Sequence, residues 1–174
     1  MKNLFFLFCF LIATVSFSQT SVNEGMKTYL NANGTVNYYS NVVDRMFDFL
    51  KKEYEAQNVP ESVWNELSIV KEEALIEITE LIIQSYEGHF SQDEMKTMLA
   101  FYDTDAGKKV LFKEDLGPED VNQRDAFYAS ALGQKIASSS ESLNGILQKL
   151  TQEWSGQLFK DVKHKLEEKG YIKG

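Results

Sequence analysis

The sequence predicts an all-α fold, a single-domain bundle of about five to seven helices that follows a cleaved signal peptide. Apolar residues recur at three- and four-residue steps along most of the chain, which is the period of an amphipathic helix. No alternating β-branched run bounded by turn residues occurs, so strands have little support. Both prolines, Pro60 and Pro118, are followed by an acidic residue, as is common in the first turn of a helix.

The first residues predict export. Met1-Lys2-Asn3 supplies one positive charge, residues 4–12 form an unbroken apolar run, and Ser16 and Ser18 have the spacing of a signal-peptidase site. This combination is typical of a secretory signal peptide, and the run is shorter than the roughly 20 residues that a spanning helix needs. We therefore expect residues 1–18 to be removed. The mature chain is then expected in the periplasm or secreted, with no integral membrane segment.

Breaker residues divide the rest of the chain into helices. Residues 19–36 are expected to form an N-terminal extension or short helix, and residues 37–170 the helical domain. Ser91 and Glu94 have the spacing of a capping box, and Gly170 is expected to end the last helix. Inside the domain, helices are expected at about residues 37–56, 60–88, 91–102, from 118 onward and at 143–169.

Two features of these helices lead to further expectations. In the helix that starts near Pro60, Ile69, Ile76 and Ile83 add a second apolar stripe to the main face. The wide apolar arc predicts a central helix that touches neighbours on two sides. The serine run at residues 138–140 is expected to mark a helix start or a flexible join.

Two short stretches repeat one pattern. Residues 100–110 and 126–136 share A-F-Y-x-[ST]-x-x-G-[KQ]-K-[VI]. Thr104 and Ser130 are expected to cap the helix that follows each Phe-Tyr pair, and the glycine three residues later allows a close backbone approach. The pattern predicts a helix–kink–helix joint used twice, either as a structural corner or as the lining of a ligand pocket. The residues concerned are Phe101, Tyr102, Gly107, Phe127, Tyr128 and Gly133.

The first joint, together with the segment before it, resembles a known family. The run Tyr86-x3-Phe90-Ser91-x2-Glu94, followed by Phe101-Tyr102-x-Thr104-x2-Gly107-Lys108-Lys109, is similar to the signature of the bacterial domain of unknown function 2059. The resemblance covers roughly residues 40–150, and the capping box favours the first joint as the family's. It implies an exported helical protein and carries over no activity and no catalytic residue. Asp105 and Ala131 stand where the family often has proline, and Met95 where it often has leucine.

Composition and spacing argue against most chemical sites. A formal charge of −8 without a basic cluster disfavours nucleic-acid binding. His89 and His164 lie far apart, and the one cysteine, Cys9, belongs to the signal peptide, so no zinc site is predicted. The chain has no G-x-S-x-G nucleophile elbow and no glycine-rich phosphate loop. We expect no catalytic, cofactor-binding or metal-binding residue, and no cofactor.

Three functions remain open. The sequence favours a non-enzymatic exported module that contacts a protein or another component of the cell envelope. The alternatives are a helical binder of a small apolar ligand near the repeated Phe-Tyr joints and an enzyme of an unrecognised type.

Overall fold

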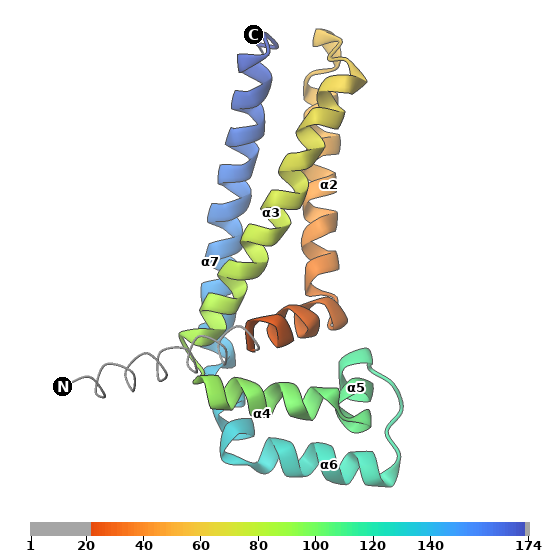
Figure 1. The fold of residues 1–174 in the computed structure, drawn as a ribbon, viewed down its shortest axis with the longest axis vertical. Coiled ribbons are helices and arrows are strands. Elements are labelled where there is room, and N and C mark those ends of the chain that lie inside the picture. The colour runs from red at the N-terminus through yellow and green to blue at the C-terminus, as the bar shows by residue number, and fades with distance from the viewer. Residues whose placement is uncertain (1–21, 173–174) are drawn as a thin grey trace, which may run out of the picture. The chain divides into compact units, whose positions relative to one another are not determined.

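The computed structural model describes residues 22–172 and has an all-α fold (Figure 1). These residues form seven α-helices, one short 3-10 helix and no strand, so the predicted all-α class and helix number are confirmed. The predicted signal peptide, residues 1–18, lies outside the described residues. The division into a segment 19–36 and a helical domain 37–170 stays a prediction.

The elements begin and end close to the predicted breakers. Ser91 caps one helix, Pro118 opens another, and Gly170 has a φ of 91° just beyond the end of the last. The first described helix covers residues 22–32. The others are α2 (Thr35–Glu53), the 3-10 helix η1 (Glu55–Gln57), α3 (Glu61–Glu87), α4 (Gln92–Asp103), α5 (Asp105–Phe112), α6 (Pro118–Ala129) and α7 (Ala131–Glu168).

The serine run does not interrupt the chain. Residues 138–140 lie inside α7, so the expected helix start or flexible join at this point is wrong. The hydroxyls of Ser138 and Ser140 donate to the carbonyls of Lys135 and Ala137, three residues earlier. Serine side chains that bond back to the helix in this way can be accommodated in its interior. The run therefore remains helical.

Contacts divide the described residues into two compact units. Unit 1 contains residues 22–33 and 86–140, and unit 2 contains residues 34–85 and 141–172. Most of α3 and α7 belongs to unit 2, while the end of α3 and the start of α7 belong to unit 1.

Unit 1 is built from the helix over residues 22–32, α4, α5, α6 and the first turns of α7. The N-terminal helix buries every fourth residue, which places one face inward. Helix α6 has no buried residue and lies at the surface of the unit. The buried apolar side chains are those of Val22, Met26, Leu30, Phe90, Met95, Met98, Phe101 and Ala106.

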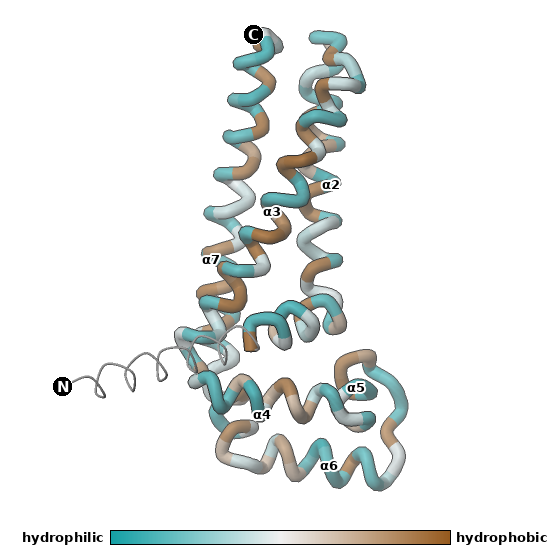
Figure 2. The backbone as a smooth tube through the Cα atoms, viewed as in Figure 1, coloured by the Kyte–Doolittle hydropathy of each residue, from teal (hydrophilic) through white to brown (hydrophobic). Residues whose placement is uncertain are grey.

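Unit 2 is an array of three long amphipathic helices, α2, α3 and α7, in which apolar and polar turns alternate (Figure 2). The Tyr39 and Thr151 hydroxyls hydrogen-bond at 2.6 Å between α2 and α7, and Lys71 pairs with Asp44 at 2.7 Å between α3 and α2. The buried residues include Val43, Phe47, Leu50, Tyr54, Trp64, Leu67, Ile78, Ile82, Trp154, Leu158, Val162 and Leu166.

The second apolar stripe of α3 is only partly covered. Ile83 is buried, but Ile69 and Ile76 are 62% and 60% exposed. The predicted contacts on two sides are present, because α3 meets α2 through the Lys71–Asp44 pair and lines a groove with α7, but Ile69 and Ile76 lie outside these contacts. An array of three helices gives α3 two helical neighbours and leaves one of its sides open. None of the helices within residues 22–172 combines the length and hydropathy needed to cross a membrane.

Candidate functional site

Both predicted joints are present and have the same hydrogen bonds. At the first joint, the Thr104 hydroxyl accepts from the Gly107 amide at 3.0 Å and donates to the Phe101 carbonyl at 2.7 Å. At the second, the Ser130 hydroxyl accepts from the Gly133 amide at 3.1 Å and donates to the Phe127 carbonyl at 2.6 Å. Both capping residues have extended backbone, with φ near −70° and ψ of 162°. The predicted caps are confirmed, and each satisfies an amide left free in the first helical turn.

The glycine of each joint allows a contact between two backbones. A Cβ atom on Gly107 would lie 2.0 Å from the Phe101 carbonyl oxygen, and one on Gly133 would lie 2.4 Å from that of Phe127. Neither distance is tolerable, and the atoms met belong to the backbone, which cannot move aside as a side chain can. The close approach predicted from the pattern is thus found at both joints.

The two joints lie against each other in unit 1. The Phe101 and Phe127 rings stack with centroids 3.9 Å apart and planes 3° apart. The Tyr102 and Tyr128 hydroxyls are 3.5 Å apart. The cross pairs are also alike: Tyr102 to Phe127 measures 6.1 Å and Phe101 to Tyr128 measures 6.2 Å. Each aromatic residue of one joint therefore faces the equivalent residue of the other joint, as two copies related by a twofold axis would.

The repeat extends beyond the pattern found in the sequence. At a constant offset of 26 residues, Glu94 corresponds to Asp120 and Lys109 to Lys135. We call residues 91–112 the first hairpin and residues 117–138 the second hairpin. Lys135 of the second hairpin pairs with Glu94 of the first at 2.6 Å, and Lys109 of the first pairs with Asp120 of the second at 2.6 Å. The ion pairs are thus reciprocal, like the aromatic contacts.

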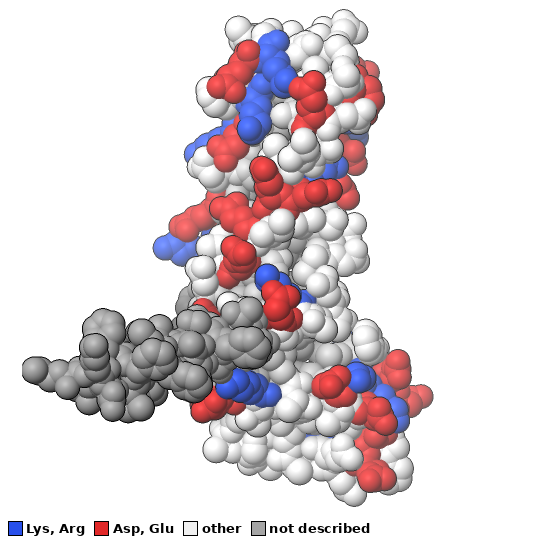
Figure 3. Space-filling view, viewed as in Figure 1, with Lys and Arg blue, Asp and Glu red and all other residues white. Residues whose placement is uncertain are grey.

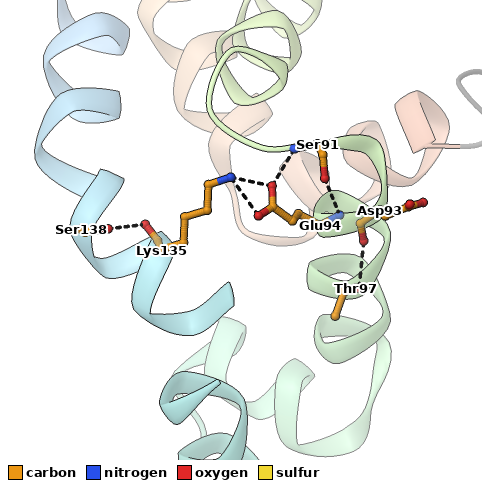
Figure 4. Close-up of polar contacts among 6 residues, drawn as sticks. All are labelled: Ser91, Asp93, Glu94, Thr97, Lys135 and Ser138. Carbon is orange, nitrogen blue, oxygen red and sulfur yellow. Dashed lines mark hydrogen bonds and ion pairs between the residues drawn. The ribbon is translucent and has the colours of Figure 1, made fainter. Parts of the chain in front are cut away.

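Each acid of these pairs also holds the start of its own helix. A Glu94 carboxylate oxygen accepts from the Ser91 amide at 2.8 Å, and the Ser91 hydroxyl accepts from the Glu94 amide at 3.3 Å (Figure 4). This is the predicted capping box, now confirmed. In the second hairpin an Asp120 oxygen accepts from the Gly117 amide at 3.0 Å. Figure 4 shows that the Lys135 side chain reaches from α7 to the Glu94 carboxylate on α4.

The ion pairs move the pKa values of their members. The hydrogen bond from Lys135, and then that from the Ser91 amide, lower the pKa of the Glu94 carboxyl. The hydrogen bond from Lys109, and then that from Gly117, lower the pKa of Asp120. The same pairing raises the pKa of Lys109. All three groups are held more firmly in their charged forms.

A row of tyrosines continues from the joints into unit 1. Tyr29 hydrogen-bonds to Tyr86 and to Tyr102, and Tyr102 in turn meets Tyr128. The Tyr29 and Tyr102 ring centroids are 5.0 Å apart. Burial raises the pKa of Tyr29, Tyr86 and Tyr102. These phenols therefore stay neutral at physiological pH and act as hydrogen-bonding groups.

The structure brings the six residues singled out at the two joints together in this one cluster. The facing rings contact one another directly, and Tyr128 has the most exposed ring, at 36%. Sequence reasoning missed Tyr29 and the reciprocal pairing of Lys109 and Lys135, although both lysines belong to the repeated pattern and Tyr86 belongs to the family signature. The constant offset of 26 residues, continued toward the N-terminus of the pattern, is the signal that relates Glu94 to Asp120. The six residues predicted are Phe101, Tyr102, Gly107, Phe127, Tyr128 and Gly133.

Unit 2 carries a groove that the sequence reasoning did not foresee. It lies between α3 and α7 and has a volume of about 680 Å³. On the α7 side, Ile146, Leu150, Trp154 and Leu158 follow one another at four-residue steps, and Leu81 lies on the α3 side. Their four-residue spacing is also that of a buried helix face. Ile146, however, is 43% exposed, so the row runs from the core out to an open surface.

The two histidines lie apart from both features. His164 is 3.5 Å from Glu168, one helical turn away, and the His89 ring lies beside Phe90. Within residues 22–172, no three His, Cys, Asp or Glu side chains are grouped so that they would hold a metal ion. Asp103, the last residue of α4, pairs with Lys108 of α5 at 3.0 Å.

Comparison with known proteins identifies one family. Residues 77–115 match a family model described as "Uncharacterized protein conserved in bacteria (DUF2059)". The matched segment contains the end of α3, all of α4 and α5, and the capping box, so it covers the first hairpin and not the second. No curated protein and no solved structure matches the chain. The resemblance stated from the sequence is confirmed: over residues 77–115 the chain is similar to this uncharacterised bacterial family.

Proposed function

We propose that the protein is an exported, non-enzymatic helical module that binds another protein of the cell envelope through the α3–α7 groove of unit 2. The observation that carries this proposal is the groove itself. It leaves Ile146, Leu150 and Leu81 accessible above the buried Trp154 and Leu158, and an accessible apolar strip on a helical surface can receive a partner's helix. An envelope partner follows from the export signal expected in residues 1–18.

The ionisable groups support a binding role over a catalytic one. In the described part of the chain, the shifted carboxyl pKa values are lowered, and the shifted lysine and tyrosine values are raised. Each shift moves the pKa of the group further from pH 7. General acid–base catalysis benefits from the opposite, a pKa near the working pH.

The stacked joints do not favour the alternative of a small apolar ligand at this place. Phe101 and Phe127 contact each other at a centroid distance of 3.9 Å, so each ring covers the face that such a ligand would need. The groove is therefore the better-supported binding surface.

Export is tested by the N-terminus of the protein recovered from cells that carry the gene naturally. We expect a mature chain that begins at Gln19 and is found in the periplasm or the medium. A chain that still begins at Met1 and stays in the cytosol would overturn the export part of the proposal.

Binding through the groove is tested by photo-crosslinking in the same cells. A photoreactive amino acid at Ile146, which lines the groove, is compared with one at Ile69, an even more exposed isoleucine of unit 2 outside it. We expect a discrete protein adduct from position 146 that position 69 does not give. Adducts that are identical from both positions, or absent from both, would contradict the proposal.

A further inference from the structure

The apolar floor of the α3–α7 groove has the dimensions of a helix-binding site. Its lining on α7 runs from Ile146 to Leu158, twelve residues or about 18 Å. Ile146 and Leu150 are accessible, whereas Trp154 and Leu158 are buried and form the packed base of the groove. An α-helix of about 12 residues spans the same length and presents one apolar residue per turn. The regular four-residue steps along α7 suit such a partner, because ridges on one helix pack into grooves formed by another.

The rim of the groove is acidic on both sides. Glu73 and Glu77 come from α3, and Glu153 and Asp161 come from α7. Figure 3 shows acidic side chains gathered over α3 and α7, with fewer basic ones among them. The residues that line the groove and its continuation toward the end of α7 include five carboxylates, of Glu73, Glu77, Glu153, Asp161 and Glu168, and two lysines, Lys149 and Lys165.

Several of these charges have no partner of opposite sign. Lys149 is 3.8 Å from Glu153, but no described cation forms an ion pair with Glu73, Glu77 or Asp161. Unpaired carboxylates beside an apolar floor attract a partner that brings positive charge to the rim. They also repel a second copy of this chain, which would bring the same acidic rim to the contact.

From these observations we infer that the α3–α7 groove binds an amphipathic α-helix of a partner protein, with an apolar stripe of about 12 residues flanked by Lys or Arg. The inference rests on the proposed function and specifies the partner's chemistry. The apolar stripe covers Ile146 and Leu150 of α7 and Leu81 of α3, and the flanking cations lie against the carboxylates of both helices. Affinity then falls with rising salt, because exposed ion pairs are screened.

The test uses two labelled synthetic peptides as probes, and fluorescence anisotropy with the purified protein. One is an amphipathic helix of leucine and lysine, and the other has every lysine replaced by glutamate. We expect the lysine peptide to bind and the glutamate peptide to bind at least about tenfold more weakly, with the difference shrinking at high salt. Equal binding of the two peptides, or none, would overturn the inference.

Matched variants distinguish the groove from general attraction to an acidic protein. Ile146→Lys places a cation inside the groove, and Ile69→Lys places the same charge on the exposed face of α3 outside it. We expect the first to weaken binding of the lysine peptide by about tenfold and the second by less than about twofold. Equal losses would show that the peptide does not use the groove.

Glu73→Gln combined with Glu77→Gln tests the rim itself. We expect weaker binding of the lysine peptide and a shallower dependence of affinity on salt. If instead the protein forms a dimer in sedimentation that Ile146→Lys abolishes, a second copy occupies the groove and the inference fails. Crosslinks from position 146 to a partner that presents no basic helix would leave the proposed function standing and refute this inference alone.

Discussion

The first and second hairpins share one joint and differ in what surrounds it. Phe101 of the first hairpin is only 9% exposed and belongs to the core of unit 1, whereas Phe127 is half-buried on a helix with no buried residue. The helix after the first joint is eight residues long, and the helix after the second is 38. Since the joint hydrogen bonds are the same, a few local residues determine the kink. Burial and helix length depend on the elements that each hairpin meets.

The helix starts differ as well. In the first hairpin both the Ser91 hydroxyl and the Glu94 carboxylate satisfy free amides. In the second, Gly117 has no side chain to contribute, so Asp120 alone caps the start of α6. The second hairpin therefore depends more on its ion pair with Lys109 than the first does on Lys135.

The largest expected difference between the hairpins is at the stacked phenylalanines. We expect Phe101→Ala to lower the free energy of unfolding by about 3–5 kcal/mol, because it leaves a cavity in a buried site. Phe127→Ala should cost roughly 1–2 kcal/mol, because its ring is less fully buried than that of Phe101. Denaturant unfolding measures both. Equal losses would mean that the two hairpins are equally buried in solution, and the contrast between them would not hold.

Substitution of the joint glycines should show where the hairpins agree. We expect Gly107→Ala and Gly133→Ala each to destabilise the protein by roughly 2–3 kcal/mol, because the added methyl meets backbone atoms. Gly145 and Gly156, inside α7, serve as controls, because a methyl added at either position would have no other atom within 4 Å. Their change to alanine should stabilise by about 0.5–1 kcal/mol, as in an ordinary helix interior. Stabilisation at position 107 or 133 would show that the tight joint does not form.

The smallest expected effect concerns the reciprocal ion pairs and is read from the dependence of stability on pH. The pKa values of Glu94 and Asp120 are lower in the folded protein than in the unfolded chain. Their contribution is thus fully present above the ordinary carboxyl pKa, and it is lost as the pH falls below about 4. The raised pKa of Lys109 adds a contribution that is lost only as the pH rises above about 10.

The carboxyl variants identify the groups that cause this effect. Glu94→Gln and Asp120→Asn should each flatten the acid side of the stability profile, with Asp120→Asn the more damaging because Gly117 offers no second cap. Asp93→Asn is the control, since the Asp93 side chain is almost fully exposed and its carboxylate pairs with Lys96 at 3.5 Å, while its hydrogen bond with Thr97 uses the backbone carbonyl. If both variants lose stability at low pH just as the unmodified protein does, the ion pairs do not stabilise the folded state.

The features that could be predicted from the sequence are local ones. The capping box at Ser91, the caps at Thr104 and Ser130, and the close approach at the two glycines each involve residues within a few positions of one another. Such contacts can be predicted from sequence spacing, because each side chain hydrogen-bonds to a backbone group only a few residues away. The all-α class followed in the same way, from the period of the apolar residues.

The features that could not be predicted depend on which helices meet. The periodicity of α3 shows that Ile69 and Ile76 share a stripe, but it does not show how many neighbours the helix will have. The row from Ile146 to Leu158 likewise has the spacing of a core face, although part of it lines an open groove. The Glu94–Lys135 pair joins residues 41 positions apart, so only the three-dimensional arrangement reveals it.

The reciprocal pairing ties the composition of one hairpin to that of the other. Replacing Glu94 would leave Lys135 without its ion-pair partner, and replacing Asp120 would do the same to Lys109. Neither hairpin can therefore change alone at these positions without losing an ion pair. One such segment carries both the acid and the lysine of the contact and is complementary to itself, as each half of a symmetric dimer must be. In this protein the two halves of such a dimer follow one another along a single polypeptide.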